Sequence, residues 1–190
     1  LKALNWMGKL HGVEMSLAVE VERINYNQRK QFAKKILDHY GPEISGKQVG
    51  IWGLSFKPGT DDMREAPSIL LIKSMLEQGA NIRAYDPEAT VKRHFANDSR
   101  VVQVKTARAV LEHSDFLVIL TEWDEFLGYT AEDFALLTDK TVFDGRNCFD
   151  PREMISRGIT YFCVGRNLFV KRRTAGKEVG NIFENKSFSI

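Results

Sequence analysis

The chain has 190 residues, of which 43% are hydrophobic and 27% charged, a composition that excludes a disordered or fibrous protein. Its 27 basic and 25 acidic residues give a net charge of +2, so nothing attracts it generally to nucleic acid or to an anionic membrane. The length predicts one main domain with an appended element. Two cysteines, no apolar run of the roughly 18 residues that span a bilayer, and no signal-peptide pattern predict a cytoplasmic protein.

Residues 1–44 are predicted to form a helical region. In residues 1–12, four apolar residues recur about one turn apart, which indicates a short amphipathic helix that ends at Gly12. A longer stripe predicts a helix over 15–40, ~37 Å long at ~1.5 Å per residue, which Gly41-Pro42 ends. The polar residues in its middle are typical of a solvated face, and the alternative is a connector or dimer helix. The stripe consists of Leu17, Val21, Ile24, Phe32, Ile36 and Tyr40.

From residue 45 to 170, predicted strands and helices alternate, which is the pattern of a doubly wound, Rossmann-like parallel sheet of five or six strands with helices on both sides. Residues 171–190 show little periodicity and are predicted to be a mobile tail. The expected strands are 49–53, 81–85, 101–104, 115–120, 141–144 and 159–164, and the expected helices are 67–78, 88–98, 107–112, 130–137 and 151–157.

The stretch 49–68, VGIWGLSFKPGTDDMREAPS, predicts a strand, a wide loop and a helix N-terminus. It is no dinucleotide fingerprint, because its glycines read GxxG and about a dozen residues separate Gly53 from Pro67. Charge for a phosphate would have to come from the side chains of Lys57 and Arg64, with Asp61 and Asp62 holding a cation or ordering the loop. The alternative is a surface turn with solvated charges, and spacing alone favours neither.

Two further segments follow strands. In FDGRNCF, Arg146 would lie on the same carboxyl edge as Lys57, so that two cations could converge on one diphosphate. In TEWDEF, residues 121–126, three acids without a histidine are more typical of a helix N-terminus than of a metal site. Cys148 and Cys163 have no activating neighbour and are interpreted as buried apolar residues. The sequence offers no convincing nucleophile, base or metal ligand set.

The segment GLSFKPGTDDMREAPS resembles the hallmark of the UDP-glucose/GDP-mannose dehydrogenase family, in its UDP-sugar-binding C-terminal domain. VERINYNQRKQF, NIRAYDP, TEWDEF and FDGRN follow in the family's order, and the resemblance covers residues 1 to about 166. Within the family, FKPGTDDMRE together with TEWDEF is most similar to UDP-glucose 6-dehydrogenases. The resemblance implies that Phe56 and Lys57 contact the diphosphate of a UDP-sugar, that Arg146 is a second UDP-sugar contact and that Arg64 reaches NAD. It also implies a homodimer through the long helix.

The family uses NAD to oxidise the sugar's C6 alcohol to a carboxylate through a cysteine-bound intermediate, and UDP-glucose becomes UDP-glucuronate in this subgroup. The family's cysteine motif and GxGxxG domain are not in this sequence, and neither Cys148 nor Cys163 matches the catalytic cysteine. The resemblance therefore implies the C-terminal portion of such an enzyme, with no catalytic residue in this chain. Alternatives are a UDP-N-acetylmannosamine or GDP-mannose dehydrogenase portion, or a non-catalytic dimerising module. We expect no NADH from UDP-glucose with this chain alone.

Overall fold

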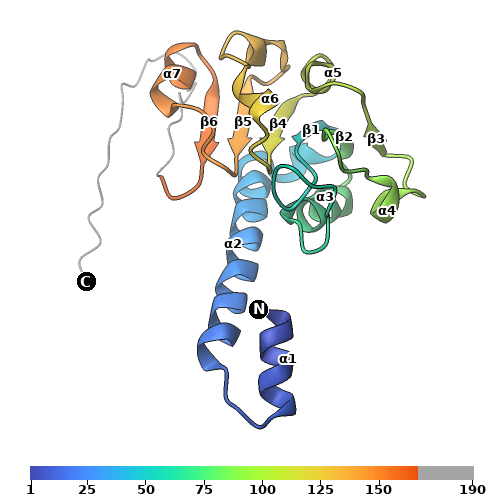
Figure 1. Cartoon of the computed structure of the whole chain (residues 1–190). Coiled ribbons are helices and arrows are strands. Elements are labelled where there is room, and N and C mark those ends of the chain that lie inside the picture. The colour runs from blue at the N-terminus through green and yellow to red at the C-terminus, as the bar shows by residue number, and fades with distance from the viewer. Residues whose placement is uncertain (167–190) are drawn as a thin grey trace.

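The structure, a computed structural model, describes residues 1–166 (Figure 1). The predicted tail, 171–190, lies outside the described residues, as do the last residues of the segment 45–170. No helix among the described residues is long and apolar enough to cross a membrane.

Six strands form one sheet in which every pairing is parallel, in the order β3-β2-β1-β4-β5-β6. This confirms the doubly wound fold. The central strands β1, β4 and β5 are buried along nearly their whole length because helices cover the sheet on both faces. The strands are β1 (Gln48–Trp52), β2 (Asn81–Tyr85), β3 (Val101–Gln103), β4 (Phe116–Ile119), β5 (Thr141–Asp144) and β6 (Thr160–Cys163).

Each face of the sheet carries its own hydrophobic cluster. On one face, the carboxyl half of α2 and all of α3 pack against β1 and its neighbours, with Ile36 and Ile72 fully buried. On the other, residues of α5, the turn η2 and α7 form a second cluster that includes Trp52, which stacks on Phe126 at a centroid distance of 4.9 Å. The helices are α1 (Lys2–Leu10), α2 (Ser16–Tyr40), α3 (Pro67–Glu77), α4 (Lys92–Phe95), α5 (Ala107–Leu111), α6 (Asp124–Leu127) and α7 (Pro151–Ser156), with the 3-10 turns η1 (Gly41–Ile44) and η2 (Asp133–Leu136).

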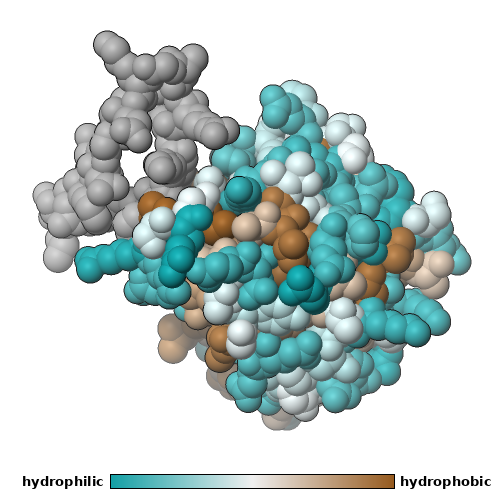
Figure 2. All heavy atoms as spheres, turned by 90° about the horizontal axis from the view of Figure 1, so that it is seen from above, coloured by the Kyte–Doolittle hydropathy of each residue, from teal (hydrophilic) through white to brown (hydrophobic). Residues whose placement is uncertain are grey.

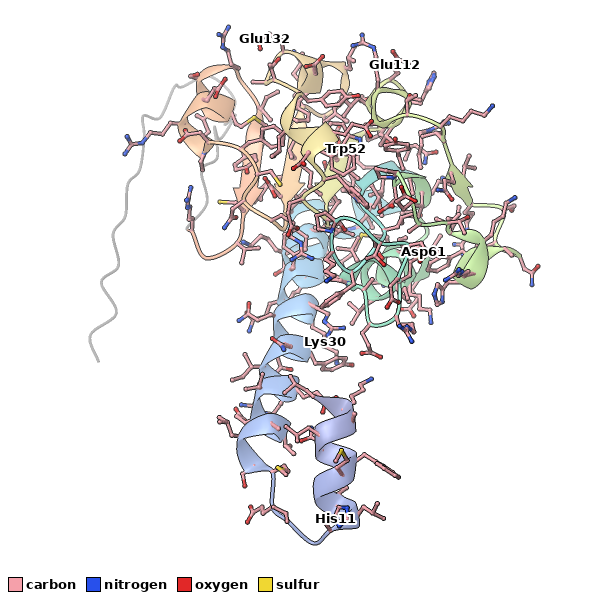
Figure 3. All side chains as sticks on the ribbon, viewed as in Figure 1. His11, Lys30, Trp52, Asp61, Glu112 and Glu132 are labelled. Atoms are coloured by element: carbon pink, nitrogen blue, oxygen red, sulfur yellow. The ribbon has the colours of Figure 1, made fainter. Side chains whose placement is uncertain are left out.

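Helices α1 and α2 form a hairpin that projects from the sheet, with His11 near its far end and Lys30 partway along α2 (Figure 3). The helix α2 has the predicted length, 25 residues, but its stripe is only half buried: Ile36 and Tyr40 pack on the sheet, whereas Leu17 is 80% exposed. In α1 the predicted apolar face also points away from its neighbour. Its buried residues are Asn5 and Gly8, and Asn5 donates a 2.7 Å hydrogen bond to Glu22 of α2.

Two predicted helices were wrong in extent. The helix expected over 88–98 is the single turn α4, because residues 86–91 are instead tied to the buried carboxylate of Asp86 and to the side chain of Gln103. The helix expected over 130–137 is the 3-10 turn η2. The interpretation of TEWDEF as a helix N-terminus is confirmed, since Asp124 and Glu125 form the first turn of α6.

Loops after β1 and β4 approach so closely at the centre of the sheet that Gly53 cannot carry a side chain. Its φ is +87°, and a Cβ there would lie 2.5 Å from Cβ and 2.6 Å from the backbone nitrogen of Thr121. Gly59, in the same loop, has a φ of +75° but open space around it. Substitution of Gly59 would therefore introduce only an unfavourable φ, whereas substitution of Gly53 would add a steric clash to it.

We predict that Gly53→Ala lowers the free energy of unfolding by more than about 2 kcal/mol, because it adds a clash with backbone to the unfavourable φ. Gly59→Ala, with the φ penalty alone, should cost about 1 kcal/mol. Urea denaturation of both variants measures the difference. Equal losses would contradict the close approach of the two loops.

Candidate functional site at the carboxyl edge of the sheet

The strand order reverses between β1 and β4: from β1 the chain continues outward on one side through β2 and β3, and from β4 it continues on the other side through β5 and β6. In such sheets, the crevice at the carboxyl ends of these two strands is where ligands bind. The loop 53–66 follows β1, and residues 120–123 follow β4. The hydroxyl of Thr121 donates a 2.6 Å hydrogen bond to the carbonyl of Ser55, so the two loops are joined at the crevice.

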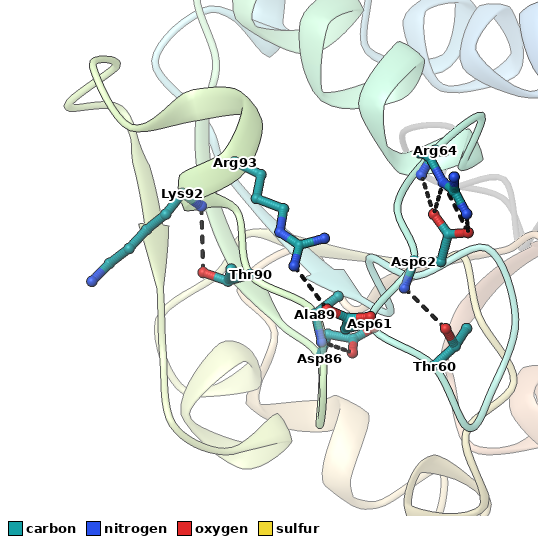
Figure 4. A network of polar contacts seen from close by, with 9 residues as sticks. All are labelled: Thr60, Asp61, Asp62, Arg64, Asp86, Ala89, Thr90, Lys92 and Arg93. Carbon is teal, nitrogen blue, oxygen red and sulfur yellow. Dashed lines mark hydrogen bonds and ion pairs between the residues drawn. The ribbon is translucent and has the colours of Figure 1, made fainter.

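Asp86, at the end of β2, holds the same loops from the other side. Its side chain is buried, with 4% exposed. Oδ2 accepts hydrogen bonds from the backbone nitrogens of Leu54 and Ser55 at 2.7 and 3.0 Å, and from Nε1 of Trp123 at 3.1 Å. Oδ1 accepts from two backbone nitrogens of its own loop, one of them that of Ala89 (Figure 4). One carboxylate thus orders the loops after β1, β2 and β4.

Burial acts against the charge of Asp86 and would raise its pKa. Hydrogen bonds from four backbone N–H groups favour the ionised form more strongly, and the pKa lies below its ordinary value of 3.8. The carboxylate is therefore ionised at neutral pH. The negative charge of Asp86 orients the N–H donors of the loops that surround it.

Arg146 lies just after β5 and reaches the loops after β4 and β1. Its Nε donates to the carbonyl of Leu120 at 2.7 Å and lies 3.1 Å from a carboxylate oxygen of Glu122, while Nη2 donates to the carbonyl of Phe56 at 3.1 Å. The backbone of Arg146 is held in turn by Asp144, which is fully buried at the end of β5. The guanidinium therefore has a fixed place at the carboxyl edge, beside the residue that precedes Lys57.

Phe56 and Lys57 stand at the surface of this edge. Phe56 is 49% exposed although its backbone is pinned, since its nitrogen donates to the carbonyl of Asp62 at 2.8 Å. Lys57 is exposed and makes no hydrogen bond or ion pair with any residue in the range 1–166. An ordered backbone with a free ammonium group can bind an anion without first breaking an internal contact.

The acids of the loop hold the two arginines near it (Figure 4). Asp62 pairs with Arg64 through Nε and Nη2, and these bonds lower the pKa of Asp62 to about 2. Asp61 pairs instead with Arg93 of α4 at 2.9 Å. The side chain of Arg64 is 88% exposed, and among the described residues its polar contacts are with Asp62 and not with the partners of Arg146.

The two cysteines lie at the other end of this edge, near β5 and β6. Burial and the neighbouring Asp144 raise the pKa of Cys148 to about 12, and burial raises that of Cys163. Neither thiol is a thiolate at neutral pH, which is the form that a nucleophile requires. Among residues 1–166, no group of three or more His, Cys, Asp or Glu side chains is placed to hold a metal ion.

Sequence reasoning missed two residues of this site. In the sequence, Asp86 indicates only the end of a strand, because its hydrogen bonds reach loops that are distant along the chain. Glu65 has no sequence signal of its own. It has a φ of +60°, pairs with Lys2 at 2.6 Å, and its carbonyl accepts a 2.9 Å hydrogen bond from Arg29. It therefore ties both helices of the hairpin to the loop.

A family model and individual known proteins both relate this chain to one protein family. Residues 50–151 match the model of the UDP-glucose/GDP-mannose dehydrogenase family, UDP binding domain. The chain is similar to UDP-glucose 6-dehydrogenase YwqF of Bacillus subtilis, with 35% identity over 158 residues, 83% of this chain and 36% of that protein. It is also similar to a UDP-glucose 6-dehydrogenase of Pseudomonas aeruginosa, with 31% identity over 175 residues, 87% of this chain and 38% of that protein.

Solved structures agree. A UDP-glucose dehydrogenase from Pyrobaculum islandicum superposes with a TM-score of 0.67 and 28% identity, over 84% of this chain and 34% of that one. An NDP-N-acetyl-D-galactosaminuronic acid dehydrogenase from Methanosarcina mazei shares the fold, with a TM-score of 0.68 and 22% identity, over 86% of this chain and 36% of that one. The chain spans little more than a third of the relatives it matches.

We predict that Asp86→Asn lowers the free energy of unfolding by about 3 kcal/mol at pH 7, because the amide cannot accept from every donor that now faces the carboxylate. Since the folded pKa is lowered, this contribution is complete above the ordinary pKa of 3.8 and is lost as the pH falls through the folded value. Urea midpoints from pH 7 to pH 2 should show the two proteins converging in acid.

Asp61→Asn is the control, because its carboxylate is exposed and, among residues 1–166, pairs with Arg93 alone. It should change the free energy of unfolding by less than about 0.5 kcal/mol. A loss of equal size in both variants, or a wild-type advantage that does not shrink in acid, would contradict the role of Asp86.

Proposed function

The chain belongs to the UDP-glucose/GDP-mannose dehydrogenase family, whose UDP-binding domain it contains, and from this premise we propose that the edge formed by Lys57 and Arg146 binds the diphosphate of a UDP-sugar. The whole protein is an NAD-dependent UDP-glucose 6-dehydrogenase that oxidises UDP-glucose to UDP-glucuronate. The observation that carries the proposal is the 3.1 Å hydrogen bond from Nη2 of Arg146 to the carbonyl of Phe56, which places the guanidinium beside the residue that precedes Lys57.

Three residues would share the work of binding. Lys57 supplies a mobile point charge, which suits a phosphate that it must meet from solvent. Arg146 supplies a guanidinium whose position is fixed by its hydrogen bonds to the carbonyls of Leu120 and Phe56. Phe56 offers an exposed ring next to them, while its backbone stays held by Asp62. Binding of the diphosphate would orient the rest of the UDP-sugar relative to the sheet edge.

For NAD, the chain offers Arg64 and little else. The 14-residue loop 53–66 lacks the tight glycine turn that holds a pyrophosphate, so the fit to a whole dinucleotide is poor. An 88% exposed guanidinium can instead reach a cofactor that another domain holds. NAD, when bound, accepts the hydrides from the sugar. Cys148 and Cys163 do not suit the covalent step of the oxidation, because both thiols are protonated at neutral pH, and we therefore assign that step to another part of the whole protein.

The hairpin of α1 and α2 is the proposed dimer surface. Among the described residues, ten of the fifteen exposed large apolar side chains lie within residues 1–26. The side of the molecule opposite the hairpin, seen from above the view of Figure 1, is by contrast mostly hydrophilic, with hydrophobic areas between the hydrophilic ones (Figure 2). A cluster of this size on a projecting hairpin is covered best by a second copy of the same hairpin, in a symmetric pair. Segment 1–44 would then be the dimer region and 45–170 the UDP-sugar-binding domain.

We predict that Lys57→Ala weakens binding of UDP at least 10-fold, because it removes a charge-assisted hydrogen bond of roughly 1.5–3 kcal/mol. Calorimetric titration of the chain with UDP measures this. Lys73→Ala, which removes an exposed lysine from α3, should bind like the wild type. If the folded wild type does not bind UDP, or if both variants bind equally, the chain is better explained as a non-catalytic dimerising module.

For the dimer, we expect Leu17→Glu to convert the protein to a monomer in analytical ultracentrifugation, because it places a charge in the middle of an apolar interface. Leu127→Glu changes an apolar side chain with 51% exposure on α6 and should leave the dimer intact. A wild type that sediments as a monomer at every concentration would contradict this part of the proposal.

A further inference from the structure

A cavity of about 250 Å³ lies between α2, the first turns of α3 and the segments that follow β4, β5 and β6. It exists because α2 crosses closely over the end of β5. A Cβ on Gly145 would lie 3.3 Å from the ring of Phe32 and 2.9 Å from the carbonyl of Ile119. Phe32 thus forms an apolar wall next to the strand ends, and the cavity opens beside it. Neither Phe56 nor Lys57 lines this space.

The lining of the cavity contains three cations and no acid. The cations are Arg29 and Lys35 of α2 and Arg146 after β5, and Gln28 and Gln31 also line the cavity. This is unusual in a chain whose basic and acidic residues nearly balance. Three like charges are held together here at an electrostatic cost, unless an anion joins them.

Each of the three cations is fixed by a backbone carbonyl. Lys35 donates to the carbonyl of Cys163 at 2.7 Å, Arg29 to that of Glu65 at 2.9 Å, and Arg146 to that of Leu120. A carbonyl orients a cation without cancelling its charge. The site is therefore organised before an anion arrives, which lowers the entropy cost of binding.

Two acids lie near the cations but outside the lining. Glu122 is 3.1 Å from Nε of Arg146, and Glu65 is 3.8 Å from Nη1 of Arg29. Glu65 also forms a 2.6 Å ion pair with Lys2, so its charge is shared. Lys35 has a backbone carbonyl as its hydrogen-bond partner and no ion pair with a residue in the range 1–166. The net charge facing the cavity therefore stays positive.

We propose that this cavity binds a phosphate group, in a site next to the one proposed for the UDP-sugar diphosphate and joined to it through Arg146. Ligand pockets for larger molecules typically measure ~300–1,000 Å³, so 250 Å³ suits a phosphate or a small phosphorylated compound better than a whole nucleotide-sugar. Arg29 and Lys35 are the residues that distinguish this site from that of Lys57. The phosphate group is either free phosphate or a phosphate of the bound UDP-sugar.

The test is calorimetric titration of the full 190-residue chain with sodium phosphate at constant ionic strength. The wild type should bind phosphate saturably, and Lys35→Gln and Arg29→Gln should each weaken that binding at least 10-fold. Lys34→Gln is the matched control. It removes the same charge one residue away, where Lys34 is 70% exposed and pairs with Asp38, and should bind like the wild type. Urea midpoints show that each variant is folded.

Absence of saturable phosphate binding to the wild type would overturn the proposal, and so would equal affinities of the Lys34→Gln and Lys35→Gln proteins. Lys57→Ala should bind phosphate normally, so loss of the UDP site and loss of this site are distinguishable. Titration of UDP with and without phosphate then identifies the source. If phosphate weakens UDP binding, the nucleotide's own phosphate enters the cavity, and if it does not, the cavity takes a separate phosphate.

Discussion

The carboxylate of Asp86 is the constraint on which the candidate site depends. It is buried at the end of β2, and its two oxygens accept from backbone or side-chain groups in the loops after β1, β2 and β4. Surface loops are normally more mobile than the elements they connect. Here a single ionised group holds three of them, and the close approach of Gly53 to Thr121 completes the packing. The strand order places this junction at the switch point.

The wide loop and the fixed cations belong together. A dinucleotide fold of the standard kind uses backbone N–H groups at a tight turn to bind phosphate. In this chain, Asp86 uses the N–H groups of Leu54 and Ser55 for its own bonds, so they are not free for a ligand. Charge at the edge comes instead from side chains, namely Lys57 on the loop after β1 and Arg146 after β5, two strands away in the sheet. The geometry explains why cations, and not glycines, mark this site.

Much of the fold was predictable, because each strand and most helices have a distinct period in the sequence. The carboxyl-edge position of Lys57 and Arg146 followed from parallel strands alone. Which part of a long helix is buried could not be predicted in the same way. The stripe of α2 is periodic over its whole length, but only the part from Phe32 onward packs on the core of the sheet. Where a helix leaves its domain depends on tertiary packing, which a periodic pattern does not contain. For the same reason, Arg29 and Lys35 were not predicted to line a cavity.

A structure of this chain with UDP bound would test the central claim most directly. The account predicts that the diphosphate lies at the carboxyl edge, with its oxygens within hydrogen-bond distance of Nζ of Lys57 and of the guanidinium of Arg146. Asp86 should keep its bonds to the loop in that complex. A nucleotide bound at the amino edge of the sheet, or at the carboxyl edge without contact to Lys57 and Arg146, would contradict it.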